Sequence, residues 1–304
     1  MMFLFSILLG LHLAKLSSQV DLTENLLDSI DPKKFQIYYK NNSLTEETFT
    51  IKNNSKIING YPVSIKGLPY LVSLGYLSST GYWHYCGGSI VSNSQIITLK
   101  DCFANLGKNY NYYDFYTKNG YVLALLAGSD RMDVLKIRQQ LKSEIFYIID
   151  NIDYRDSDSI AILKTSVPIK FTDSVNKAIL PTTSNPWVIN GQSVVAAGWG
   201  TNEKNEASPS LHYTYMNVLN GMSNENECQG YEKNNYCCKD LSTRNGNICY
   251  GDGGGPLIHY ENNQWVLYGV ANFIFVDEKN QCINTMPGFF ATLPNSWVMR
   301  EIRN

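Results

Sequence analysis

Histidine is scarce in this chain, and both a long apolar segment after the N-terminal region and a block of basic residues are missing. The 304 residues include 4 histidines, and no segment after the N-terminal region approaches the roughly 20 apolar residues that span a bilayer. Basic and acidic side chains nearly balance, at 25 and 27, without a basic block. These absences argue against a membrane protein and against nucleic acid as a partner.

The N-terminal residues are typical of an exported protein. Residues 3–13 form a short apolar run followed by small polar residues, so we interpret residues 1–18 as a secretory signal peptide. The alternative, a membrane anchor, would need a longer run. An exported chain with seven cysteines is expected to form disulfides and to leave one thiol over.

Residues 19–56 differ from the rest of the chain. They are polar and lack cysteine, and they contain two glycosylation sequons, at Asn41 and Asn53. The segment ends in Lys56, directly before Ile57-Ile58-Asn59-Gly60. We interpret it as a propeptide with a basic cleavage site.

From residue 57 the pattern predicts short strands separated by polar turns. The predicted strands are residues 70–77, 89–91, 95–99, 121–127, 160–164, 193–198, 256–260 and 264–272. Many short strands favour an all-β sandwich or barrel. Residues 295–304 predict a final helix that begins at a cap, Asn295.

Six motifs in order resemble the trypsin/chymotrypsin family and cover nearly all of residues 57–304. They read KIINGYPV, CGGSIVSNSQIITLKDC, DSIAILK, AAGWG, CYGDGGGPL and PGFFATLPNSWV. The resemblance implies two six-stranded antiparallel β-barrels with a C-terminal helix and a cleft between the barrels.

Active relatives use a histidine, an aspartate and a serine in that chain order. In this sequence Asp101, Ser159 and Gly253 stand at the three matching positions. An exposed carboxylate has a pKa near 3.9, which is too low for an effective base at neutral pH. Asp158 is one residue early and would point to the opposite face of a strand. Gly253 has no side chain that could attack a substrate.

No other residue is expected to replace the triad. His12 lies in the predicted signal, while His84, His212 and His259 fall outside the triad motifs. Lys100 suggests a serine–lysine pair, but no serine occupies the nucleophile position. The sequence therefore predicts a protease homologue without catalytic residues.

Some family features are kept. The resemblance places Ile57, freed by cleavage after Lys56, against the carboxylate of Asp252, either as a processing switch or as an inherited structural lock. One such buried charge without its partner is strongly destabilising. The backbone N–H groups of Gly251 and Gly253 match a vestigial oxyanion hole.

The resemblance also implies three disulfides and an altered substrate pocket. The bridges are Cys86–Cys102, Cys228–Cys238 and Cys249–Cys282, with Cys237 spare, although Cys237 and Cys238 are adjacent and their assignment stays open. In the pocket, Asn247 replaces the aspartate of trypsin-like enzymes, and Ile274 replaces a glycine and is expected to crowd the cleft.

One loop is longer than in the pancreatic enzymes of the family and reads GKNYNYYDFYTKNGY. Asn119-Gly120 predicts a tight turn, and so a protruding hairpin. Tyrosine gives large contact area at low entropy cost, so Tyr110, Tyr112, Tyr113 and Tyr116 are candidate partner-binding residues. The alternative is that these rings pack onto the barrel.

Within the family, the sequence most resembles the inactivated protease paralogues of the scabies mite. That resemblance implies protein binding, inhibition of host complement, and release into the gut lumen and faeces, with no metal or cofactor. The alternatives are a cofactor for other proteases, a decoy for protease inhibitors, and a weakly active hydrolase with a rearranged site. A clip-type cofactor needs a cysteine-rich N-terminal domain, which residues 19–56 lack.

Overall fold

A computed structural model provides the structure of the chain. It describes residues 57–132 and 145–303, apart from residues 203, 207–208, 221–224, 232 and 294. Of the N-terminal part it describes Leu26, Ser29, the strand β1 (Gln36–Tyr39) and the strand β2 (Asn42–Leu44). The predicted signal peptide, both sequon asparagines and Lys56 lie outside these residues.

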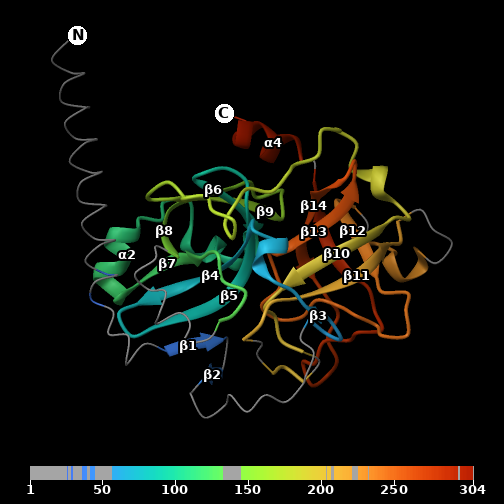
Figure 1. Cartoon of the computed structure of the whole chain (residues 1–304), viewed down its shortest axis with the longest axis horizontal. Coiled ribbons are helices and arrows are strands. Elements are labelled where there is room, and N and C mark those ends of the chain that lie inside the picture. Colours follow the sequence, from blue (N-terminus) through green and yellow to red (C-terminus); the bar gives the residue numbers. More distant parts are fainter. Residues whose placement is uncertain are drawn as a thin grey trace, which may run out of the picture.

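The first half of the domain is a closed antiparallel barrel (Figure 1). Its six strands run in the order β5-β4-β7-β8-β9-β6, and β6 returns to pair with β5. The strands are β4 (Leu71–Ser78), β5 (Gly81–Ile90), β6 (Gln95–Leu99), β7 (Tyr121–Leu126), β8 (Phe146–Tyr154) and β9 (Ile160–Thr165).

The second half repeats this architecture. The order is β10-β13-β14-β15-β12-β11, closed by pairing of β10 with β11, and β3 (Tyr61–Pro62) adds to the edge of β11. The strands are β10 (Ser193–Gly198), β11 (His212–Val218), β12 (Asn235–Lys239), β13 (Pro256–Glu261), β14 (Gln264–Phe273) and β15 (Gly288–Thr292). The predicted two-barrel fold is confirmed.

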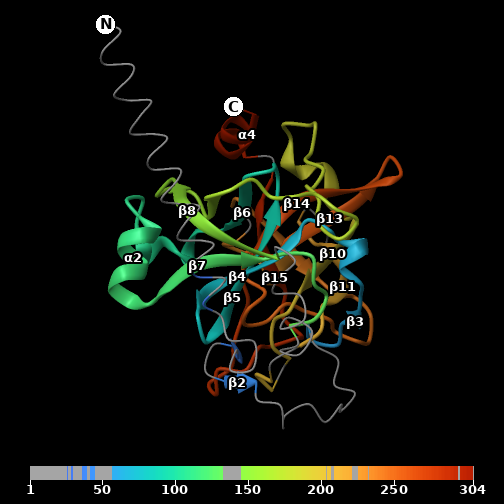
Figure 2. The ribbon, with the colours of Figure 1, turned by 60° about the vertical axis from the view of Figure 1, so that its left-hand side comes forward.

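The two barrels lie side by side, and the C-terminal helix α4 (Ser296–Arg303) sits at one end (Figure 2). Asn295 caps this helix as predicted, because its Oδ1 accepts hydrogen bonds from the N–H groups of Trp297 and Val298. Among the described residues, no helix is long and apolar enough to cross a membrane. The short 3-10 helices are η2 (Ile65–Gly67), η3 (Lys100–Cys102), η4 (Ala104–Leu106), η5 (Pro186–Ile189) and η6 (Glu225–Cys228).

The predicted hairpin in the tyrosine-rich loop is wrong, because this segment forms the helix α2 (Tyr112–Asn119). Asn111 Oδ1 accepts hydrogen bonds from the N–H groups of Tyr113 and Asp114 and so caps the start of the helix. Gly120 ends it with a φ of 74°. Asn-Gly therefore marks a helix C-terminus here rather than a hairpin turn.

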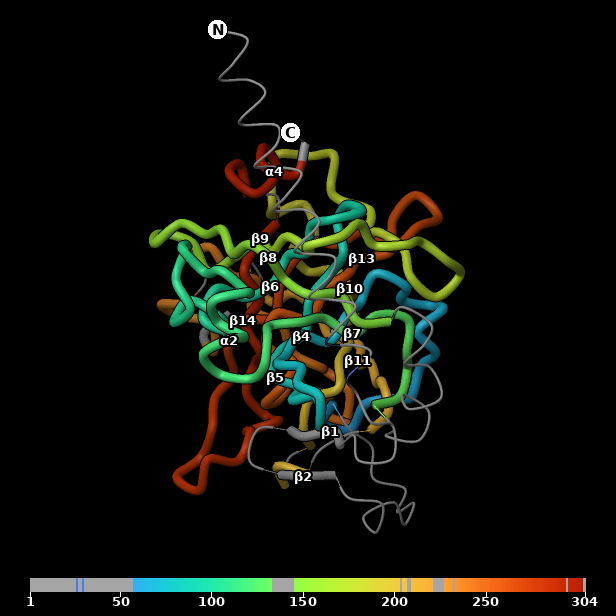
Figure 3. The backbone as a smooth tube through the Cα atoms, turned by 90° about the vertical axis from the view of Figure 1, so that its left-hand side faces the viewer, coloured from blue at the N-terminus to red at the C-terminus, as the bar shows by residue number. Residues whose placement is uncertain are grey.

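The N-terminal segment joins the first barrel. Strand β1 pairs in parallel with the start of β5, from Gln36 opposite Gly81 to Tyr39 opposite His84. Strand β2 then pairs with β1 in antiparallel fashion. In Figure 1 both strands lie below β5, outside the closed ring. Figure 3 looks onto the first barrel from the side that carries α2.

Candidate functional site

The motif CYGDGGGPL forms a loop between the two barrels. Gly87 on β5 donates its N–H to the Gly253 carbonyl at 2.8 Å, and Gly254 donates to the Ala271 carbonyl on β14 at 2.8 Å. Gly254 has a φ of 82°, and a Cβ there would lie 2.2 Å from Thr98 Oγ1. The loop backbone is thus fixed against a strand of each barrel, and only glycine fits at residue 254.

Gly253 faces apolar groups. A Cβ built on it would lie 3.6 Å from Leu99 Cδ2 and 3.9 Å from Cys86 Sγ, which are ordinary van der Waals distances. A side chain could therefore be accommodated at this position, and its nearest neighbours would be a methyl group and a disulfide sulfur.

The other two predicted triad positions lie on adjacent segments. The Lys100 N–H donates to the Ser159 carbonyl at 2.7 Å, at the point where β6 ends and β9 begins. Asp101 follows directly in η3 with an exposed side chain. Lys100 Nζ donates to the Asp156 carbonyl at 3.1 Å. The structure thus gathers the three segments at one place.

Asp158 is committed elsewhere. Its Oδ1 accepts a hydrogen bond from Asn295 Nδ2 at 3.1 Å. This contact joins the end of the first barrel to the cap of α4, so the carboxylate one residue before Ser159 has a structural partner.

Sequence reasoning missed a buried hydrogen-bonded chain that reaches the CYGDGGGPL loop. His84 Nε2 lies 3.1 Å from the Gly251 carbonyl, and His84 Nδ1 lies 2.7 Å from Ser73 Oγ, which in turn lies 2.9 Å from the Tyr82 hydroxyl. Because a carbonyl can only accept, Nε2 carries the proton and Nδ1 accepts from the Ser73 hydroxyl in the neutral ring. Burial lowers the pKa of His84 to about 4.

This imidazole–hydroxyl pair is closed to substrate. Ser73 is 0% exposed and His84 is 2% exposed. The His84 ring also forms a T-shaped pair with Trp199, which directly follows β10, at a centroid distance of 6.4 Å. The pair therefore links the barrel interior to the loop. His212 and His259 each place Nδ1 2.9 Å from a backbone carbonyl, of Ser210 and Ser193 respectively.

The carboxylate of Asp252 is enclosed beside the end of β10. It accepts hydrogen bonds from the N–H groups of Gly200, at 2.8 Å, and Cys249, at 2.9 Å. A Cβ on Gly198 or Gly200 would approach it to 2.2 Å, so both glycines are needed for the socket. Burial raises the pKa of Asp252 to about 7, while the two N–H donors oppose that rise.

Ile57 and Ile58 lie fully inside the domain. Ile58 and Asn247 exchange backbone hydrogen bonds, at 2.9 and 3.1 Å. Ile57 has a φ of 48°, a left-handed conformation that is strained for a β-branched residue. The N-terminal end of the domain is therefore inserted beside the predicted substrate pocket.

Asn247 and Ile274, the two predicted pocket residues, both lie beside Ile58. Asn247 is buried, its Nδ2 donates to the Met286 carbonyl and its Oδ1 accepts from the Ile248 N–H, each at 2.9 Å. Both ends of the amide are thus used within the protein. Ile274 packs against Ile58 and the Cys249–Cys282 disulfide.

One predicted disulfide is wrong. The bridges are Cys86–Cys102, Cys249–Cys282 and Cys228–Cys237, so Cys238 rather than Cys237 is the free thiol. Neighbouring residues of a strand point to opposite faces. On β12, Cys237 packs with Cys228 in a separate buried cluster that includes Leu219 and Phe289, whereas Cys238 enters the core of the second barrel. Burial raises the pKa of the Cys238 thiol well above its usual range.

Two of the four candidate partner-binding tyrosines are core residues. Tyr110 and Tyr112 are 7% and 2% exposed, which corrects their assignment to a binding surface, and the Tyr110 hydroxyl accepts the Leu123 N–H at 3.1 Å. Tyr116 is partly buried against the first barrel. Tyr113 is 49% exposed. The apolar side of α2 therefore covers the barrel, and Tyr113 remains on the outer side.

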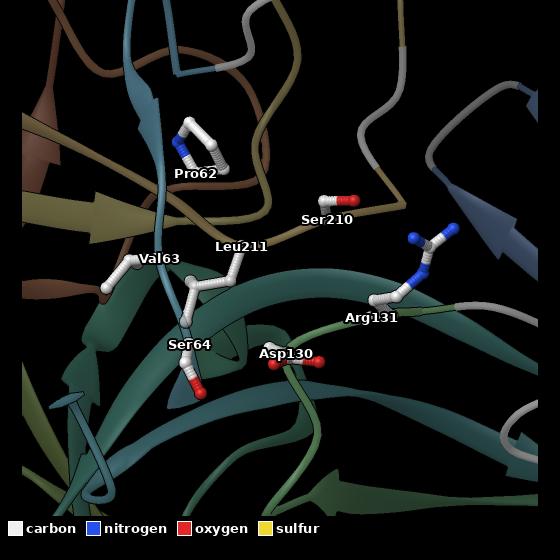
Figure 4. A pocket seen from close by; sticks show the side chains of 7 residues that line it. All are labelled: Pro62, Val63, Ser64, Asp130, Arg131, Ser210 and Leu211. Carbon is white, nitrogen blue, oxygen red and sulfur yellow. The ribbon is translucent and has the colours of Figure 1, made fainter. Parts of the chain in front are cut away.

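A separate surface depression lies where the chain crosses between barrels, and Figure 4 shows its lining residues. They are Pro62, Val63, Ser64, Asp130, Arg131, Ser210 and Leu211. None of them belongs to the predicted triad, oxyanion or pocket positions. Within the part of the chain that the structure describes, no group of three or more His, Cys, Asp or Glu side chains could hold a metal ion.

Comparison with known proteins gives consistent matches. A family model described as Trypsin matches residues 57–298. Trypsin alpha of Drosophila melanogaster is 28% identical over 253 residues, 81% of this chain and 87% of that protein. Trypsin 5G1 of Aedes aegypti is 26% identical over 69% of this chain and 73% of that protein. Ovochymase of Halocynthia roretzi is 24% identical over 72% of this chain but 13% of its own length.

Proposed function

Because the chain belongs to the trypsin family, we propose that it is a member without protease activity that acts by binding other proteins. The observation that carries this proposal is Gly253 at the nucleophile position, with Leu99 and a disulfide as its nearest neighbours. Serine becomes a nucleophile only when a base lies beside it. Here the hydroxyl is missing, and Asp101 stands at the position of the base.

The alternative of a rearranged hydrolase rests on Ser73 and His84. They are the one serine–histidine pair at hydrogen-bonding distance among the side-chain contacts described above. Ser73 is 0% exposed, so a substrate carbonyl has no approach to its hydroxyl. A catalytic nucleophile must meet the reacting carbon at close range, and this burial favours the binding function.

We also propose that cleavage after Lys56 completes the fold. Ile57 is buried in a strained conformation, and its φ exists only while the bond to Lys56 is intact. Asp252 is a buried carboxylate with two backbone donors. A free α-amino group at Ile57 would remove the strained dihedral and supply the cation that a buried carboxylate needs. The N–H groups of Gly251 and Gly253 then form a vestigial oxyanion hole without a reaction to serve.

The altered pocket supports the same proposal. Asn247 supplies no negative charge for a basic substrate side chain, and its amide is already hydrogen-bonded. Ile274 fills space beside it. Both features lower the affinity for an extended substrate peptide.

We further propose that the partners are host complement components and that the protein is released into the gut lumen and faeces. This assignment rests on the resemblance of the sequence to the mite paralogues. The three disulfides and the trypsin family are consistent with an extracellular protein. A decoy for protease inhibitors is disfavoured, since such inhibitors insert a loop into an open cleft.

The test uses full-length protein cut after Lys56. It is incubated with a broad peptide library and, separately, with an active-site-directed serine reagent, beside a matched preparation from cells that lack the gene. We expect turnover and labelling at the level of that control. Turnover above it, or stoichiometric labelling, would refute the loss of catalysis. A complement lysis assay with the same protein should show dose-dependent inhibition, and its absence at micromolar protein would refute the complement role.

A further inference from the structure

The first four residues of β5 lie beyond the point where β6 closes the ring of the first barrel. Strand β4 pairs with one side of β5 along its length, from Leu71 opposite Ser89 to Leu77 opposite Tyr82. On the other side β6 pairs with Ser89 and Ile90. Residues 81–84 therefore lie outside the closure of the ring, and an unpaired strand edge is a template for another strand.

In the uncut chain this edge is occupied by the N-terminal segment. Strand β1 pairs in parallel with residues 81–84, and β2 pairs with the far side of β1 (Figure 1). The pairing is made by backbone groups, so any extended segment that can adopt the parallel register meets the same donors and acceptors.

A second contact holds the same segment. Leu26 is 1% exposed and belongs to the buried hydrophobic cluster of the first barrel. The segment before Ile57 thus contacts the barrel through an aliphatic side chain and, farther along the chain, through an added strand.

The edge leads toward the CYGDGGGPL loop. His84, the last residue in register with β1, places its ring against the Gly251 carbonyl. Three residues farther along β5, Gly87 donates to the Gly253 carbonyl. A strand bound at residues 81–84 is therefore directed toward the place where the three substituted triad positions meet.

We propose that residues 81–84 of β5 are an acceptor site for an extended strand of a partner protein, and that β1 occupies this site until the chain is cut. The partner offers a strand in parallel register. Upstream of that strand it offers an aliphatic side chain that takes the place of Leu26 in the hydrophobic cluster of the first barrel. While the segment is covalently attached, its effective concentration excludes a competitor. Cleavage after Lys56 makes the segment a separate molecule that dilution removes.

This inference rests on the proposed function in one respect, the cut after Lys56, and the test installs that cut directly. Replacing residues 52–55 by Asp in the full-length chain creates an enteropeptidase site that ends in Lys56 and leaves Ile57 as the new N-terminus. The protein is folded uncut, then cut, and the released segment is washed away. A fluorescent peptide of residues 24–46 is titrated against both forms, and its anisotropy is recorded.

We expect saturable binding to the cut form and at least tenfold weaker binding to the uncut form. A peptide with Ile37→Pro and Tyr38→Pro stays extended but loses the N–H donors of both residues, so it should not bind. A Leu26→Asp peptide should bind more weakly. Equal binding to both forms, binding to neither, or equal binding of the proline peptide would overturn the proposal.

Hydrogen exchange gives an independent measurement on the same samples. The backbone amides of residues 81–84 that point away from β4 should exchange faster after the segment is removed, whereas those of β10 in the second barrel should be unchanged. Unchanged exchange at residues 81–84 would contradict the proposal. Peptide turnover by the cut form would refute the loss of catalysis alone, so the two failures are distinguishable.

Discussion

The carboxylate of Asp252 accepts the Gly200 N–H at 2.8 Å inside a socket whose other wall is the Cα of Gly198. This contact joins the motif AAGWG, where β10 ends, to the motif CYGDGGGPL, which leads into β13. In the uncut chain the carboxylate is buried with backbone donors, and burial raises its pKa from 3.8 to about 7. Close by, burial lowers the pKa of His84 from 6.5 to about 4.

These two groups should give opposite pH dependences of stability in the uncut chain. Between pH 4 and 7 the folded state binds more protons at Asp252 than the unfolded state, so its contribution to the free energy of unfolding falls as pH rises. Between pH 4 and 6.5 the unfolded state binds more protons at His84, so that contribution rises with pH. Asp252→Asn removes the falling contribution, so its urea midpoint should rise from pH 4.5 to 6.5 when compared with the parent protein over the same range. His84→Gln removes the rising contribution, so its urea midpoint should fall over that range in the same comparison. Parallel changes in the two variants would contradict these assignments, and the double variant is the control.

Gly253→Ser should fold normally without gaining proteolysis. The new Cβ meets Leu99 and Cys86 at ordinary contact distances, so the free energy of unfolding should change by about 0.5 kcal/mol or less. The hydroxyl gains no histidine base, and a serine without a base is a poor nucleophile. Hydrolysis of ester and peptide substrates by the variant, compared with the parent protein, measures this, and a clear rate increase would show that a base is present after all.

Loss of the hydroxyl should destabilise the protein at Tyr110 but not at Tyr113. Tyr110→Phe leaves the Leu123 N–H without its acceptor, which costs about 1–3 kcal/mol. Tyr113→Phe removes an exposed hydroxyl and should change stability by less than about 0.5 kcal/mol. Thermal unfolding of the two variants measures this difference. Equal destabilisation would show that Tyr113 packs in the core as Tyr110 does.

Cys237 and Cys238 should differ sharply on substitution. Cys237→Ser opens the bridge to Cys228, which in the chain-entropy model costs about 2–3 kcal/mol for a loop of this length. Cys238→Ala removes a buried thiol and should cost about 1 kcal/mol. The native protein should also resist thiol reagents until it is unfolded, because Cys238 is buried with a raised pKa. Rapid labelling of the native protein would contradict the pairing.

Ile274→Gly should widen the region beside Asn247 without creating activity. The isoleucine packs against Ile58 and the Cys249–Cys282 bridge, and a glycine removes that contact while the triad positions stay substituted. Binding of a peptide inhibitor of trypsin-like enzymes, followed by calorimetry, should tighten relative to the parent. Unchanged or weaker binding would show that Ile274 does not obstruct the cleft.

Much of the fold follows from local sequence. Ser193–Gly198 is predicted with its observed bounds because a short run of branched and small apolar residues follows the turn residues Asn190 and Gly191. The hairpin turn at Asn262 and Asn263 adopts positive φ values of 49° and 61°, the conformation that asparagine tolerates. Strands such as β12 escaped notice because their pairing with distant strands, rather than their own pattern, defines them.

The site was less predictable. Motif spacing was enough to bring residues 101, 159 and 253 to one region, because the family fold fixes those segments. The Ser73–His84 contact depends on the register of β4 with β5, which no local pattern encodes. The pairing of Cys228 with Cys237 depends on which face of β12 each thiol takes, and two adjacent cysteines carry no signal for that choice. The parallel pairing of β1 likewise has no local signature.

The helix α2 carries its own start and stop signals, Asn111 and Gly120, and it is anchored from below by Tyr110 and Tyr112. Side chains at its outward positions, such as Tyr113, therefore do not contribute to the packing of the barrel. Gene copies of such a chain can exchange those outward residues one at a time and acquire new recognition properties, while the rest of the molecule folds as before.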